Sequence, residues 1–156
     1  MKLTLLTLSL LLSLATLPRT FQTKPDWKYV ITSEDDRDTW KTYYDAANIE
    51  RQPKNIVRVW LKQVPVTTSD AEMQHIINAI IENRRVNEMS TKGYEKFAYS
   101  LMLVEFDCAG RRGRSIAIKD VDQAEKPLSS DTRDDAPFAP VVEHSVSEVI
   151  MEAACK

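Results

Sequence analysis

The sequence predicts an α+β fold, an antiparallel β-sheet with a C-terminal α-helix packed on one face and tethered by a disulfide, plus an inserted middle helix. Three observations support it: strand-like segments recur along the chain, two segments have helical periodicity, and Cys108 and Cys155 fall near the ends of a predicted strand and a predicted helix. With 156 residues, 43% of them apolar and 28% charged, the chain has the size and mixture of one globular domain.

The N-terminus has the pattern of a secretory signal peptide. Lys2 is followed by the apolar run Leu3–Leu14 and then by small residues. We therefore expect a signal peptide over residues 1–20, cleaved after Ala15 or later, and a single domain over residues 21–156. An uncleaved membrane anchor is the alternative, but spanning a bilayer takes roughly 20 apolar residues. The run has no cysteine at its end, so we expect neither a lipoprotein nor a stable membrane anchor after cleavage.

Three strands are expected in the first third of the domain. Trp27–Ser33 and Trp40–Asp45 are rich in aromatic and β-branched residues and flank an Asp-rich turn, so they predict a hairpin. Arg51–Lys54 contains a proline and predicts another turn. Asn55–Lys62 then alternates apolar and polar residues, which predicts a strand with one buried face formed by Val57, Val59 and Leu61.

The middle of the chain changes to helical periodicity. From Ser69 to Arg85, apolar residues recur at steps of three and four, namely Ala71, Met73, Ile76, Ile77, Ile80 and Ile81. Ser69 or Asp70 is the expected N-cap. This pattern predicts an amphipathic helix inserted between strands.

A second hairpin is expected after this helix. Phe97–Cys108 and Ser115–Val121 have strand character and flank the Gly-containing segment Ala109–Arg114, which we interpret as the turn. Gln123–Pro140 is dense in Asp, Ser and Pro and is expected to be an exposed loop or a partly ordered connection. In the longer strand, alternation puts four residues on one face: Met102, Val104, Phe106 and Cys108.

The C-terminal segment predicts a helix that the disulfide would hold to the sheet. Ser145 and Glu148 have the spacing of a capping box, and the helix is expected to end at Cys155. An exported chain meets an oxidising compartment, where two thiols usually pair, and Cys108 is the only available partner. Two buried free thiols or a reactive pair are the alternatives.

No pattern of catalytic or metal-binding residues is found. His75 and His144 have no second His or Cys at ligand spacing, and the chain's three glycines cannot form a phosphate-binding loop. The acidic residues Glu34, Asp35, Asp36 and Asp38, and later Asp131, Asp134 and Asp135, lack the ligand spacing of a calcium loop. We expect no catalytic residue, metal or cofactor, and a formal net charge of −2 argues against a nucleic-acid partner.

Three arginines are the candidate partner-binding residues. Arg111, Arg112 and Arg114 cluster at the predicted hairpin tip, where long cationic side chains suit an acidic partner, a polysaccharide or an anionic lipid. The alternative is a solubilising turn. The tryptophans and tyrosines of the predicted strands are expected in the core, or at an interface where they are exposed.

An ordered set of short segments resembles the surface-adhesin E family of bacterial exported proteins. The segments are Trp27–Ser33, Tyr43–Asp45 with Ile49 and Arg51, Asn55–Trp60, Glu105–Cys108, Arg111–Arg112, and Ser147–Glu148 ahead of Cys155. The resemblance implies an antiparallel sheet with a C-terminal helix tethered by the disulfide, as the residue patterns do. It also implies adhesion to host matrix, although a fold alone does not determine a function.

These observations favour an exported, non-catalytic binding module in the periplasm or on the outer cell surface. An adhesin acting by protein–protein contact is the first hypothesis, and a periplasmic inhibitor or envelope-assembly factor is the alternative. The expected partner is another protein, with host matrix as one candidate and a homodimer as another arrangement. A small-molecule carrier or enzyme is least favoured, because no convergent polar groups are recognisable.

Overall fold

The structure, a computed structural model, describes residues 23–34 and 38–156. The predicted signal peptide and two residues of the first acidic cluster, Asp35 and Asp36, lie outside the described residues. No helix within the described ranges is long and apolar enough to cross a membrane.

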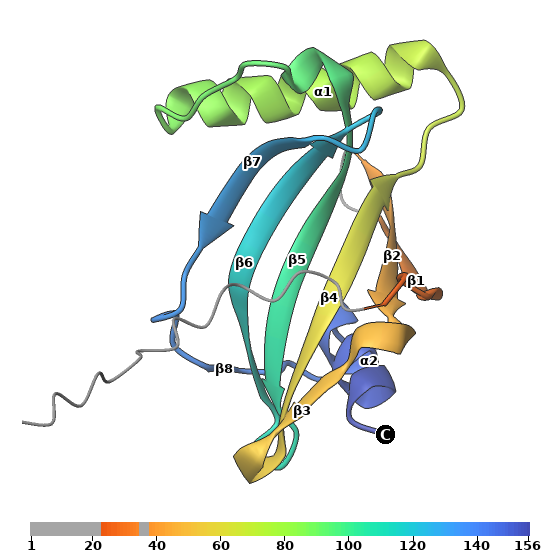
Figure 1. Ribbon diagram of the computed structural model, residues 1–156. Helices are drawn as coiled ribbons and strands as arrows, with labels where there is room; N and C mark the ends of the chain where they lie inside the picture. Colours follow the sequence, from red (N-terminus) through yellow and green to blue (C-terminus); the bar gives the residue numbers. More distant parts are fainter. Residues whose placement is uncertain (1–22, 35–37) are drawn as a thin grey trace, which may run out of the picture.

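An antiparallel sheet forms the body of the protein (Figure 1). Its main strands follow the order β1-β2-β4-β5-β6-β7, and two short strands pair beside this path, β3 with β4 and β8 with β6. Short connections favour antiparallel pairing of successive strands, as between β5 and β6, whereas β4 and β5 pair across the long segment that contains the inserted helix. The strand bounds are β1 Trp27–Glu34, β2 Thr39–Asp45, β3 Glu50–Gln52, β4 Ile56–Pro65, β5 Phe97–Asp107, β6 Arg112–Asp122, β7 Pro127–Thr132 and β8 Ala139–Pro140.

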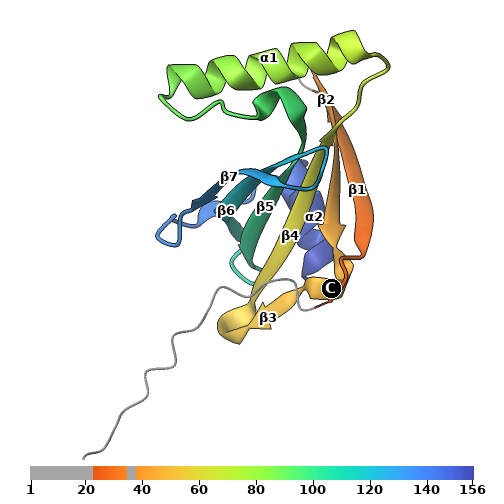
Figure 2. The ribbon, with the colours of Figure 1, turned by 45° about the horizontal axis from the view of Figure 1, so that its top comes forward.

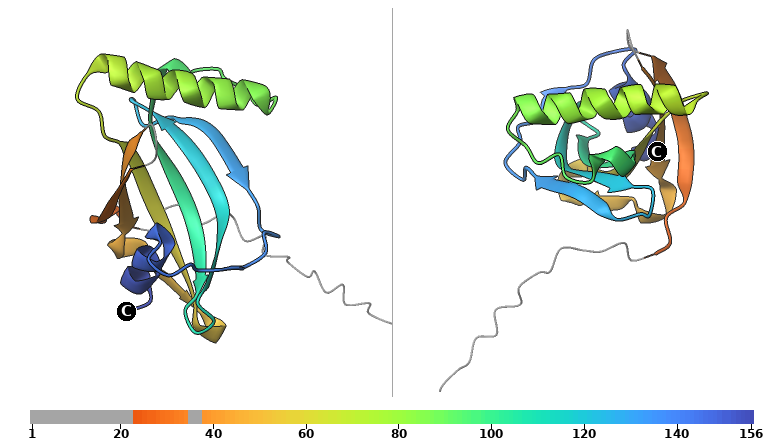
Figure 3. Two further views of the ribbon diagram at one scale, coloured as in Figure 1. Left: turned by 180° about the vertical axis from the view of Figure 1, so that it is seen from behind. Right: turned by 90° about the horizontal axis from the view of Figure 1, so that it is seen from above.

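One face of the sheet is covered by the C-terminal helix α2, Val146–Ala154. This helix lies behind the sheet in Figure 1 and in front of it in the opposite view (Figure 3). Because side chains alternate between the two faces of a strand, every second residue of β4 and β5 points toward the helix. These residues pack against the apolar side of α2. The resulting core contains Val57, Val59, Leu61, Phe106, Ile150, Met151 and Ala154.

Both ends of α2 are fastened as the sequence predicts. Ser145 accepts a hydrogen bond from the backbone N–H of Glu148, and Glu148 accepts one from the backbone N–H of His144. At the other end, Cys155 is bonded to Cys108 with a Cα–Cα distance of 5.9 Å. The predicted disulfide is therefore confirmed, and it holds the helix over the apolar face.

The inserted helix α1, Asp70–Val86, lies across one end of the sheet. Its N-cap is Ser69, whose hydroxyl accepts a hydrogen bond from the backbone N–H of Glu72. The 3₁₀ turn Tyr94–Lys96 lies beneath it (Figure 2). Gly93 precedes this turn with φ of 84°, a conformation that glycine adopts without strain. Here Ile77, Tyr94 and Phe97 form a second, smaller core.

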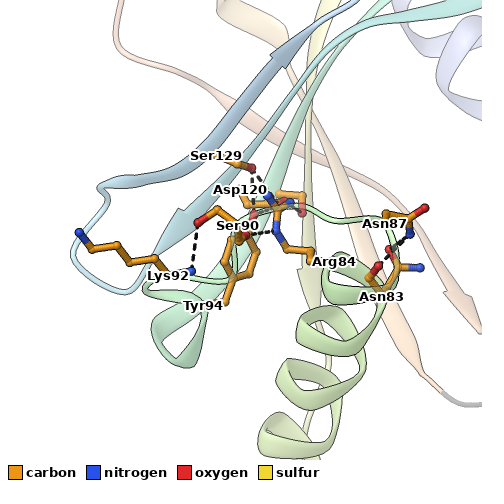
Figure 4. A network of polar contacts seen from close by, with 9 residues as sticks. Asn83, Arg84, Asn87, Ser90, Lys92, Tyr94, Asp120 and Ser129 are labelled. Atoms are coloured by element: carbon orange, nitrogen blue, oxygen red, sulfur yellow. Dashed lines mark hydrogen bonds and ion pairs between the residues drawn. The ribbon is translucent and has the colours of Figure 1, made fainter.

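A polar network next to this second core connects α1 to Asp120 of β6 (Figure 4). The Tyr94 hydroxyl donates to the Asp120 carboxylate at 2.6 Å, and Arg84 of α1 lies 3.6 Å from the same carboxylate. The Arg84 guanidinium also lies 4.3 Å from the Tyr94 ring centroid. Burial, together with Asp120, raises the pKa of Tyr94 to about 12, so the phenol stays a donor.

Three expected connections are corrected by the structure. The expected loop Gln123–Pro140 contains β7 and β8, and the expected turn Ala109–Arg114 ends earlier, because β6 begins at Arg112. The expected turn Arg51–Lys54 overlaps β3. The strands β7 and β8 lack apolar–polar alternation because they are mostly exposed. They join the sheet through backbone pairing, which does not require apolar side chains.

Candidate functional site

The face of the sheet opposite α2 carries no helix of the described chain and is turned toward the viewer in Figure 1. Strand pairing arranges its side chains in cross-strand rows on β4, β5 and β6. Two of these rows have cations at both ends, and they differ in the residue at the centre. They are called here the arginine row, Arg58–Glu105–Arg114, and the lysine row, Lys62–Leu101–Lys119.

In the arginine row, the two guanidinium groups share one buried carboxylate. Arg58 Nη2 lies 2.5 Å from Glu105 Oε1, and Arg114 Nη2 lies 2.6 Å from Glu105 Oε2. Only 3% of the Glu105 side chain is exposed. Burial acts to raise the pKa of Glu105, but the hydrogen bonds from Arg58 and Arg114 outweigh it and hold the pKa below its usual value.

Each of the three candidate partner-binding arginines is paired within the chain. Arg111 pairs with Glu148 of α2, Arg112 lies 2.6 Å from Asp107, and Arg114 belongs to the arginine row. Arg114 also donates to the backbone carbonyl of Ala136 at 2.9 Å. These contacts fasten the hairpin to α2 and to the segment after β7. Partner binding by the three arginines stays a prediction.

In the lysine row, the central position is apolar. Leu101 is 8% exposed, and neither Lys62 nor Lys119 has a carboxylate within ion-pair distance among the described residues. Both ammonium groups lie over aromatic rings instead. Lys62 Nζ is 4.0 Å from the Tyr99 ring centroid, and Lys119 Nζ is 4.9 Å from that of Trp60. Such contacts orient a cation without neutralising its charge.

The lysine row borders a groove of about 610 Å³ at one end of this face. Its lining combines an apolar floor with charged side chains at the rim, and consists of Lys24, Pro25, Trp27, Lys62, Tyr99, Leu101, Lys119, Val121, Glu125 and Pro127. Three lysines against one glutamate give this lining a formal charge of +2, whereas the whole chain has −2. Burial, with Glu125 and Asp122 adding to it, raises the pKa of Tyr99, so this phenol keeps its proton.

The groove is a candidate site that sequence reasoning missed. Lys62 and Lys119 become neighbours of Leu101 only through the register of three strands. The sequence offers a weak local signal, the alternation Trp60-Leu61-Lys62, which puts a ring and a cation on one strand face. The histidines contribute nothing to this site, since both His75 and His144 are exposed elsewhere.

No group of three or more His, Cys, Asp or Glu side chains within residues 23–34 and 38–156 is placed to hold a metal ion. On this face Glu105 and Asp107 are each paired with a guanidinium group. The arrangement offers charge, aromatic surface and an apolar floor, which are the elements of a recognition surface.

Comparison with known proteins identifies a family for this chain. The family described as Surface-adhesin protein E matches residues 27–156, which include every strand, both helices and both cysteines. Comparisons with curated proteins and with solved structures give no match. Since the family match covers most of the chain, the protein belongs to the surface-adhesin protein E family.

Proposed function

We propose that this protein is an exported, non-catalytic binding module, an adhesin that acts by protein–protein contact at the bacterial surface. Membership of a surface-adhesin family supports this proposal, and the disulfide supports export, because such bonds persist in oxidising compartments. A protein partner, with host matrix proteins as candidates, is part of the same proposal.

The observation that carries the proposal is the open sheet face with its two unneutralised lysines. In the arginine row the buried carboxylate is paired with two cations, whereas the lysine row leaves positive charge beside an apolar groove. An exposed face that combines aromatic rings with unmatched cations is typical of an interaction surface.

The first test is the protein's location on intact cells. Added protease should cleave it while a periplasmic marker survives, and a strain lacking the protein should adhere less to surfaces coated with host extracellular-matrix proteins. Protection of both proteins from protease would contradict surface adhesion and favour a periplasmic inhibitor or an envelope-assembly factor. A reproducible hydrolase or transferase activity of the purified protein would count against a binding module.

A further inference from the structure

The arginine row is an example, within this sheet, of one carboxylate bound between two cations. Glu105 on β5 lies between Arg58 on β4 and Arg114 on β6, and each guanidinium binds one of its oxygens. The lysine row lies four residues along β5 on the same face, with Leu101 at the equivalent central position. It has the flanking cations of the first row without the central anion.

The spacing of the lysine row suits an external carboxylate. Neighbouring strands lie about 4.8 Å apart, so the backbones of Lys62 and Lys119 are about 10 Å apart with Leu101 between them. Flexible lysine side chains span that distance toward one carboxylate above Leu101. Among the described residues neither lysine has a carboxylate within ion-pair distance, although Glu125 also lines the groove. Association would therefore break no ion pair of the lysine row.

The groove beside this row suits an apolar side chain. Leu101 and Val121 are 8% and 5% exposed and form its floor, and the Trp27 ring lies within 5.8 Å of Lys62 Nζ. Such a surface favours an aliphatic or aromatic side chain next to an acidic residue. The floor residues Leu101 and Val121 are aliphatic and offer no hydrogen-bonding group, so they suit an apolar peptide side chain better than sugar hydroxyls. The chemistry therefore favours a peptide over a polysaccharide.

We propose that the groove binds an extended acidic segment of a protein partner, with one carboxylate between Lys62 and Lys119 and a neighbouring apolar side chain on the groove floor. The proposal rests on the proposed function in one respect, that the partner is a protein. It adds the place of contact, the two cations that recognise the segment, and the chemical class of the segment.

The test is titration of the purified protein with synthetic peptides, followed by tryptophan fluorescence and calorimetry. One peptide has three Glu-Leu-Glu repeats, the second has Gln in place of each Glu, and low-molecular-weight heparin is the polysaccharide probe. The acidic peptide should bind and the Gln peptide should not. The double variant Lys62→Ala, Lys119→Ala should weaken binding on the order of tenfold or more, since two charge contacts are lost.

Two further double variants separate recognition from general attraction. Lys92→Ala with Lys96→Ala removes the same charge from exposed positions outside the groove and should leave affinity unchanged within about twofold. Lys62→Arg with Lys119→Arg keeps both cations and should retain affinity within roughly threefold. Equal losses in the two alanine pairs would overturn the proposal, as would heparin binding that depends on the groove lysines more strongly than peptide binding does.

A fourth variant supplies the missing anion within the chain. Leu101→Glu copies the arginine row, so its carboxylate should occupy the site and abolish peptide binding, with thermal melting as the check that it folds. If it does not fold, the alanine pair still decides the question. Absence of peptide binding with intact surface exposure and cell adhesion would overturn this inference alone. Groove-dependent peptide binding by a protein protected inside the periplasm would overturn only the surface role.

Discussion

The two faces of the sheet are stabilised in different ways. On the face under α2, apolar side chains of β4 and β5 pack against Ile150 and Met151, and the disulfide closes the contact. On the opposite face, Glu105 forms ion pairs with two arginines, whereas Lys62 and Lys119 have no carboxylate within ion-pair distance among the described residues. The α2 face is therefore held mainly by apolar packing, although it also borders a cavity of about 480 Å³, whereas the opposite face has two lysines beside its groove.

The largest expected effect is the loss of the disulfide on the closed face. Cys155→Ser opens a loop of sequence separation 47, which in the chain-entropy model lowers the free energy of unfolding by about 4 kcal/mol. Thermal melting of oxidised samples measures it, and reduced wild-type protein should melt like the variant. An unchanged melting temperature would contradict a stabilising role for the bond.

The next effect comes from the apolar contact itself. Ile150 is 4% exposed, so Ile150→Ala should cost about 3 kcal/mol through lost burial and a residual cavity. Val149 on the same helix is 37% exposed, and Val149→Ala is the matched control, expected to cost less than about 1 kcal/mol. Urea unfolding compares the two variants. Equal costs would mean that α2 does not pack through this face.

On the open face, the arginine row should contribute a smaller amount. Glu105→Gln leaves two partly exposed guanidinium groups facing a neutral amide, and solvent screens part of the cost, which should be about 2 kcal/mol. The same urea unfolding at pH 7 measures it. A neutral outcome would mean that water replaces the carboxylate without penalty.

Low pH should remove the stabilisation by Glu105 from the wild-type protein. The pKa of Glu105 is lowered in the folded state below its ordinary value of 4.5, so the unfolded chain binds this proton first. The stabilisation is present above pH 4.5 and is lost as the pH falls through the lowered pKa. Glu105→Gln should therefore show a shallower loss of stability between pH 4.5 and pH 2 than the wild type. Parallel pH profiles would argue against a lowered pKa.

The polar network under α1 should have a comparable or smaller effect. Tyr94→Phe removes the hydrogen bonds to Asp120 and Ser129 while keeping the ring, at a cost of about 1.5 kcal/mol. Because the pKa of Tyr94 rises from 10.0 to about 12 on folding, its contribution is present below pH 10 and is lost as pH rises through that interval. Tyr29→Phe, at a residue 57% exposed, is the control and should leave both stability and its alkaline profile nearly unchanged.

The smallest effect on stability is expected from the lysine row. The pair Lys62→Ala, Lys119→Ala breaks no ion pair and removes two cation–ring contacts between partly exposed side chains, so the change should stay below about 1 kcal/mol. Unfolding measured beside Glu105→Gln makes the contrast between the two rows direct. A loss as large as that of Glu105→Gln would mean that the lysines serve the fold rather than a partner.

Much of the closed face was predictable from the sequence. The alternation of Val57, Val59 and Leu61, the capping box at Ser145 and the pair of cysteines together predict a sheet, a helix and the bond between them, and the structure confirms each. These features are readable because burial imposes a period on the residues, two for strands and 3.6 for helices. The edge strands β7 and β8 escaped prediction because exposed backbone pairing imposes no such period.

The sequence by itself determined the fold class, the disulfide and the resemblance to an adhesin family, since these depend on local periodicity and residue identity. The tertiary structure decided which charges are satisfied. Arg114 and Lys119 look alike as cations on one strand, but strand register places Glu105 beside the first and Leu101 beside the second. That pairing joins residues far apart in sequence, so the distinction between a cation paired with a carboxylate and one beside an apolar residue exists only in the folded sheet.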